Sequence, residues 1–247
     1  MTVTVNKHGL PRTIPADVKL QVRKSCGFGC VICGNGIVDY EHVEPEFKDA
    51  RVHDPKGIAL LCPGCHAMVT RKQWSKARVK LAMRSPASLQ EGAVRQFFDF
   101  CEGTPALKMG ETILYGCEVL IHFHGHDLFS VKPPEEEGSP FRLSGIFTDS
   151  AGNPTLEIID NEWIASSSAW DIEVVGPRIT IREGERNIAL ILKAEPPNLL
   201  VVEKLNMNLG GYKIAVSGDS FILQDRNGRT NTFVGGSISG RTALAIL

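Results

Sequence analysis

The sequence lacks long apolar segments. No run of about 18 apolar residues occurs among its 247 residues, so we expect no transmembrane helix and no membrane partner. Residues 1–15 contain neither an apolar core nor a small-residue cleavage site, so we also expect no signal peptide. Hydrophobic residues make up 43% and charged residues 22%, which excludes collagen-like, low-complexity and wholly disordered chains. We therefore predict a globular, cytoplasmic protein.

The net charge is also small, −1, but it is distributed unevenly. Residues 1–101 hold 15 Lys and Arg against 9 Asp and Glu, a balance of +6. Residues 102–247 hold 12 against 19, a balance of −7. A basic half joined to an acidic half predicts two domains with different partners, the basic one being a candidate for binding a polyanion. We place the boundary at Gly103, which gives domains 1–103 and 104–247.

Cysteine is the exception to this ordinary composition, with seven residues, an odd number. Four of them form two pairs, Cys30-x-x-Cys33 and Cys62-x-x-Cys65, separated by 28 residues. Without a secretion signal, such pairs favour metal binding in a reduced compartment over disulfides. We predict that these four residues form a structural Zn²⁺ site, the alternative being four unrelated buried cysteines. Cys26 lies four residues before Cys30. It is a candidate for an additional zinc ligand, but we expect it to pack in the core instead.

Hydrophobic periodicity and turn residues divide the first domain into short elements. We expect strands at 37–43 and 58–61, and helices at 15–25, from His66 onward, at 75–84 and at 88–101. Beyond residue 103, short alternating segments bounded by Gly, Pro and Asn predict an all-β domain, a sandwich or a barrel. The expected strands there are 112–124, 141–147, 156–159, 172–175, 178–181, 188–192, 199–205, 212–216 and 221–224, with residues 234–247 a last strand or a tail.

Three segments of the first domain together resemble a known family. They are Cys30-Val-Ile-Cys33-Gly34, then Tyr40-Glu41-His42-Val43-Glu44-Pro45, then Ile58-Ala-Leu-Leu-Cys62-Pro-Gly-Cys65-His66. In this order, over residues 12–100, they resemble an HNH endonuclease domain of the ββα-metal type. The resemblance implies an α+β fold class, with a zinc-stabilised ββα-metal domain and flanking helices followed by the all-β domain.

The resemblance also implies roles for individual residues. Glu41 and His66 match the ligands of a catalytic divalent ion, Mg²⁺ or Mn²⁺, and His42 matches the general base. The asparagine that the family places between them falls at Gly57, which is a departure. Because that asparagine orders the loop that carries the base, we expect His53 or Asp54 to do so here.

The implied activity is metal-dependent hydrolysis of phosphodiester bonds in nucleic acid, DNA more than RNA, with weak sequence preference. Basic residues after His66 are candidates for holding phosphates, although a solvated helix face explains them equally well. These candidates are Arg71, Lys72, Lys76, Arg78 and Lys80.

The second half resembles no family, and its role is a hypothesis. We expect it to regulate the first domain, sense a ligand or form oligomers, as in a bacterial antiviral defence effector. Two alternatives remain: a non-enzymatic zinc module that binds nucleic acid or protein, and a sensor or assembly protein with a nuclease output. The tract His122-Phe-His124-Gly-His126 is a transition-metal site or, as we favour, a set of exposed histidines.

Overall fold

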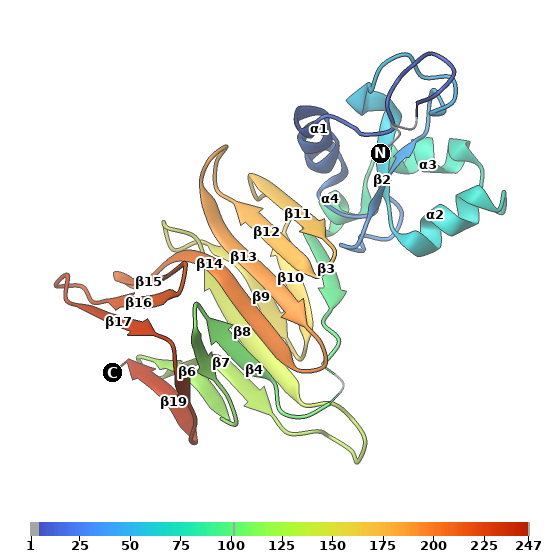
Figure 1. The fold of residues 1–247 in the computed structure, drawn as a ribbon. Coiled ribbons are helices and arrows are strands. Elements are labelled where there is room, and N and C mark those ends of the chain that lie inside the picture. Colours follow the sequence, from blue (N-terminus) through green and yellow to red (C-terminus); the bar gives the residue numbers. More distant parts are fainter. Residues whose placement is uncertain (1–4, 101, 247) are drawn as a thin grey trace. The chain divides into compact units, whose positions relative to one another are not determined.

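The chain forms two compact units in the computed structural model, which describes residues 5–100 and 102–246 (Figure 1). The first unit comprises residues 1–96 together with residues 170–173, and the second comprises 97–169 and 174–247. The division therefore lies at residue 96, and the first unit takes in a short segment from the later half of the sequence. No described helix is long and apolar enough to cross a membrane.

The first unit holds all the described helices and a small antiparallel sheet. Its elements are α1 (Ala16–Cys26), β1 (Asp39–His42), the 3₁₀ turn η1 (Pro55–Gly57), β2 (Ile58–Leu61), α2 (Pro63–Thr70), α3 (Lys76–Met83) and α4 (Ala87–Glu91), followed by β3 (Ala93–Phe97), which straddles the division. The α+β class is confirmed.

Strands β1 and β2 pair in register, from Asp39 opposite Leu61 to His42 opposite Ile58. Every residue of β2 is fully buried, whereas β1 is only partly covered, so β2 anchors the sheet and β1 presents polar side chains at the surface. Helix α2 begins directly after β2 because Cys62 caps its N-terminus and Pro63 supplies a preset first turn.

The core of this unit lies between α1, the β1–β2 sheet and α2. Val22 of α1 and Val79 of α3 are fully buried together with β2. Helix α1 carries Asp17 in its first turn and Arg23 and Lys24 in its last, charges that complement the helix dipole. The core thus fixes the positions of β1 and α2, from which the candidate site side chains extend.

The helix predicted over 88–101 is wrong for most of its length. Helix α4 ends at Glu91 because Gly92 adopts the left-handed conformation that terminates helices, and strand β3 follows at once. The last residue of the predicted helix, Cys101, lies outside the described residues.

The second unit is all β in its described residues and contains two sheets. One sheet has the order β19-β6-β7-β8-β9-β10, and the other the order β12-β13-β14-β15-β16-β17, with β4 beside β14, β5 beside β4, and β18 beside β5. Strands β14 and β8 contact each other, and the Asn208 N–H donates to the Asp149 carbonyl, 2.9 Å away. Figure 1 shows β13 and β14 in front of β8 and β9, a layered arrangement.

The predicted alternation finds most of these strands but misses β4, β7, β10 and β17, and β11 straddles the division between the units. The strands are β4 (Ala106–Met109), β5 (Thr112–Leu114), β6 (Val119–Phe123), β7 (His126–Lys132), β8 (Arg142–Thr148), β9 (Pro154–Ile159), β10 (Glu162–Ser166), β11 (Asp171–Val175), β12 (Arg178–Arg182), β13 (Ile188–Glu195), β14 (Leu199–Leu209), β15 (Tyr212–Ser217), β16 (Ser220–Gln224), β17 (Thr230–Val234), β18 (Ser237–Ile238) and β19 (Thr242–Ile246). The strand predicted over 112–124 is two strands, because Gly116 turns the chain with φ 61°.

The histidine tract of the second unit lies in a hairpin. His124 and Gly125 form the turn between β6 and β7, where Phe123 pairs with His126. His122 Nδ1 instead contacts Asp127 Oδ1 at 2.7 Å. The three histidines therefore do not occupy alternate positions on one straight strand, and they form no metal-binding group among the described residues.

Candidate functional site

The two cysteine pairs converge, as predicted. The sulfur atoms of Cys30, Cys33, Cys62 and Cys65 all lie within 4.8 Å of one another, and the four residues can hold a metal ion. Cys33 Sγ is 3.6 Å from Cys62 Sγ and 3.8 Å from Cys65 Sγ. A tetrahedral zinc ion with Zn–S bonds of about 2.3 Å requires sulfurs about 3.8 Å apart, so the cluster fits this ion. Cys26 is buried separately and packs in the core.

Burial and crowding act on the free thiols of this cluster. Burial, together with the neighbouring Cys30 and Cys62, raises the pKa of Cys33 to about 11. The pKa of Cys62 is lowered, because hydrogen bonds from the Cys65 N–H and the other thiols outweigh the opposing effect of burial. Since a metal binds thiolates, an ion at this cluster would displace the remaining protons.

A carboxylate and an imidazole meet beside this cluster. His66, the residue after Cys65, extends from α2, and Glu41 extends from β1; His66 Nε2 lies 3.0 Å from Glu41 Oε2. Two ligands at adjacent corners of an octahedral site with bonds of about 2.1 Å lie about 3 Å apart, so this pair fits one edge of such a site. The structure thus brings together the two residues that the sequence paired as metal ligands.

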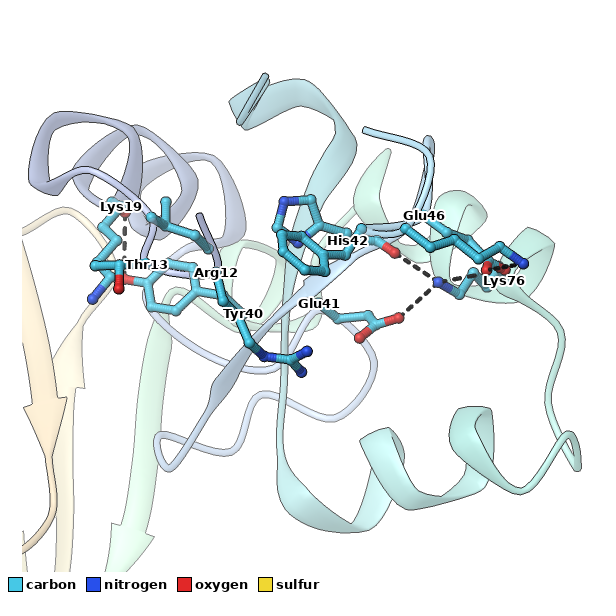
Figure 2. Close-up of a pocket in the computed structure, with 11 residues that line it drawn as sticks. Arg12, Thr13, Lys19, Tyr40, Glu41, His42, Glu46 and Lys76 are labelled. Atoms are coloured by element: carbon cyan, nitrogen blue, oxygen red, sulfur yellow. Dashed lines mark hydrogen bonds and ion pairs between the residues drawn. The ribbon is translucent and has the colours of Figure 1, made fainter. Parts of the chain in front are cut away.

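Lys76 of α3 holds the other side of Glu41 (Figure 2). Its Nζ lies 2.8 Å from Glu41 Oε1 and donates to the His42 carbonyl oxygen at 2.7 Å. Glu46 Oε1 lies 3.8 Å from the same Lys76 Nζ. Lys76, one of the predicted phosphate ligands, is therefore engaged inside the site, where it fixes the carboxylate and the end of β1.

His42 is held by a second histidine. His42 Nε2 lies 3.1 Å from His53 Nδ1, and His53 Nε2 lies 2.9 Å from the Pro11 carbonyl oxygen. A carbonyl oxygen only accepts hydrogen bonds, so His53 carries its hydrogen on Nε2 and, when neutral, presents a lone pair at Nδ1. His42 must then donate from Nε2, which leaves its Nδ1 as the basic atom.

The surroundings of His42 favour its neutral form. Burial lowers the pKa of His42, and the neighbouring His53, Lys76 and Arg12 lower it further, against the opposing charge of Glu41. The ring also borders a cavity of about 470 Å³ (Figure 2). Its lining comes from the N-terminal segment, α1, β1, the loop after β1, and α3: Arg12, Thr13, Ile14, Lys19, Tyr40, Glu41, His42, Glu46, Phe47, Lys48 and Lys76.

Gly57 has a structural reason for its identity. Its carbonyl oxygen accepts from the N–H groups of Val43 and Glu44, at 2.8 and 3.3 Å, and thereby closes the loop that follows His42. A Cβ at this position would overlap the Glu44 carbonyl oxygen, so no larger residue fits the backbone as it lies. Asp54 caps η1 through the Lys56 N–H, 3.0 Å away. Of the two candidates for the missing asparagine, His53 contacts His42, whereas Asp54 caps η1.

The other basic residues predicted to hold phosphates differ in their surroundings. Lys80 forms an ion pair with Glu44, and Arg78 lies over the Trp74 ring, 4.2 Å from its centroid. Arg71 follows α2 as its C-cap, and Lys72 comes next with φ 60°. Sequence reasoning missed Arg12 and Lys19 in the cavity wall, because they precede the three motif segments and carry no spacing signal.

Comparison of the chain with models of protein families, with curated proteins and with solved structures yields no match. The case for a function therefore depends on the residues and their geometry.

Proposed function

We propose that the first unit is a metal-dependent endonuclease of the HNH type, which hydrolyses phosphodiester bonds in nucleic acid, DNA above all. The observation that carries this proposal is the pairing of Glu41 Oε2 with His66 Nε2 at 3.0 Å, next to His42. Glu41 and His42 lie on β1, which pairs with β2, and His66 lies on α2, the helix that is capped by Cys62 and contains Cys65.

Each residue has a distinct task in this reaction. Glu41 and His66 would hold Mg²⁺ or Mn²⁺, which supplies positive charge to stabilise the phosphate oxygens and the departing 3′ oxygen. His42 Nδ1 accepts a proton from water as the water oxygen bonds to phosphorus. The bond from phosphorus to the 3′ oxygen breaks, and solvent protonates that oxygen. His53 keeps His42 in the required tautomer, and Lys76 keeps Glu41 in place.

A cleavage assay on the zinc-loaded chain tests the proposal. Plasmid, linear duplex and single-stranded DNA are incubated with Mg²⁺, with Mn²⁺ or without either ion. Omitting the ion is preferable to adding EDTA, because a strong chelator also competes for the cysteine site. We expect cutting that requires the added ion and that falls by about 100-fold or more in His42→Ala, the usual effect of losing a general base.

The matched control is His126→Ala, which removes an exposed histidine from the second unit. It should cut like the wild type. Glu41→Gln and His66→Ala should each raise the metal concentration required for half-maximal cutting. A folded, zinc-loaded wild type that cuts nothing would refute the proposal and favour a non-enzymatic zinc module, while unimpaired cutting by His42→Ala would refute the role of that residue.

A further inference from the structure

The basic side chains near the candidate site are held in two different ways. Lys76 and Lys80 contact carboxylates, Glu41 and Glu46 for the first and Glu44 for the second. A cation that already faces a carboxylate has little charge left to attract a phosphate. These lysines therefore balance charge within the first unit.

Arg12 and Lys19 are held by aromatic rings instead. The Arg12 guanidinium lies over the Phe47 ring, 5.4 Å from its centroid, and the Lys19 ammonium lies over Tyr40 at 5.6 Å. Neither has a carboxylate partner within residues 5–100 and 102–246. Their charge is therefore not neutralised by an acidic side chain in the described structure.

Both residues line the cavity that also contains Glu41 and His42 (Figure 2). Phe47 lines it too, and its ring lies 5.3 Å from that of His42, so the ring that supports Arg12 also contacts the candidate base. A guanidinium stacked on an aromatic face keeps its N–H edge free, and that edge matches two phosphate oxygens. Because the ring already restricts the side chain, less entropy is lost when it binds.

We propose that Arg12 and Lys19 form a phosphate-binding site for a nucleic-acid strand in this cavity. The two cations bind phosphates next to the scissile phosphodiester bond, which faces His42. Because Arg12 lies in the N-terminal segment and Lys19 in α1, the nucleic-acid strand passes β1 on that side. This inference rests on the proposed nuclease function, because the phosphate-binding site would position the substrate of that reaction. Binding of nucleic acid is nevertheless measurable without cleavage.

The experiment measures binding by fluorescence anisotropy, using a labelled, mixed-sequence single-stranded DNA of about 12 nucleotides. Full-length, zinc-loaded chain is titrated without Mg²⁺ or Mn²⁺ at several salt concentrations, and a gel verifies that the probe stays intact. The test variant is Arg12→Gln/Lys19→Gln. The control, Lys213→Gln/Arg229→Gln, removes the same charge from exposed positions of the second unit. A third variant, Arg71→Gln/Lys72→Gln, probes the end of α2.

Counterion release sets the expected size of the effect. Each phosphate contact to a single strand contributes about 0.7 to the slope of log affinity against log salt, which amounts to about fivefold in affinity at 0.1 M salt. Loss of both side chains should therefore weaken binding by about 25-fold and lower the slope by about 1.4. The control should stay within about twofold of the wild type.

Three results would overturn the proposal. One is wild-type binding by Arg12→Gln/Lys19→Gln, and another is equal weakening by the control pair, which would reduce the effect to net charge. The third is a strong loss confined to Arg71→Gln/Lys72→Gln, which would place the strand at the end of α2. If the chain binds through Arg12 and Lys19 but never cuts with Mg²⁺ or Mn²⁺, the phosphate site stands and the nuclease function fails.

Discussion

A buried ion pair within the first unit gives the sharpest stability prediction. Arg23 of α1 is 7% exposed and Asp171 is 1% exposed. They meet through two hydrogen bonds, Nε to Oδ1 and Nη2 to Oδ2, both 2.8 Å long. Arg23 also donates to Tyr40 Oη at 3.0 Å and to Glu173 at 3.1 Å. The pair thus connects α1, β1 and the segment 170–173.

The perturbation is Asp171→Asn, which keeps the size of the side chain and removes its charge. Breaking a buried ion pair costs about 3–5 kcal/mol, because the remaining charge is left without its partner. Glu173 and Tyr40 still contact Arg23, so we expect the lower end, about 3 kcal/mol. Arg23→Met/Asp171→Leu removes both charges and should recover most of the loss, to within about 1 kcal/mol of the wild type.

Hydrogen exchange read by mass spectrometry measures this effect for each unit separately. Peptides from α1 and β2 should lose about 100-fold in protection in Asp171→Asn, since 1.4 kcal/mol corresponds to a factor of ten. The control is Glu203→Gln, which breaks a similar two-bond contact with Arg178 whose side chain is 48% exposed. That variant should change the opening free energy by less than about 1 kcal/mol.

The reasoning is refuted if Asp171→Asn costs less than about 1 kcal/mol, or if the double variant is as unstable as the single one. The same contact bears on how the nuclease is dissected. A fragment of residues 1–103 lacks Asp171 and Glu173, and it leaves Arg23 buried without its carboxylates. Loss of activity in that fragment would then reflect instability of the first unit, so substitutions in the intact chain are the better test of control by the second unit.

Three further predictions concern the metal cluster, the histidine pair and a turn. Cys65→Ser should lower bound zinc, measured by atomic absorption, and reduce exchange protection of α2 in the first unit; zinc content equal to that of the wild type would contradict the four-cysteine site. His53→Phe keeps a ring against Phe47 but removes the acceptor for His42, so kcat should fall by about 10- to 100-fold and the ¹⁵N shifts of His42 should show a mixture of tautomers; an unchanged tautomer would contradict the role of His53. The pKa of Asp149 is lowered, because hydrogen bonds from Asn153 and nearby backbone N–H groups outweigh burial. Asp149→Asn should therefore destabilise the second unit at pH 5, and the difference should shrink as the pH falls below 3.8, the ordinary value; a difference that grows on acidification would contradict this.

Local patterns in the sequence predicted the thiol cluster, most strands of the second unit and the position of the candidate site residues. The two C-x-x-C pairs predicted the thiol cluster, because each metal knuckle is a short segment whose geometry depends on neighbouring residues. Alternating apolar residues between turn residues predicted most strands of the second unit, since burial of one face imposes a period of two. The position of Glu41 and His42 at the end of a strand, and of His66 after a cysteine, already placed those residues near one another.

Only the tertiary structure decided which groups those residues contact. Lys76 was a candidate phosphate ligand by composition, yet it contacts Glu41, because the packing of α3 places its ammonium beside that carboxylate. The partner of Arg23 lies 148 residues further along the chain, and no periodicity encodes a contact at that separation. His53 holds His42 and Arg12 stacks on Phe47 for the same reason. Such pairs depend on where loops bring single side chains, which the whole fold determines and short segments do not.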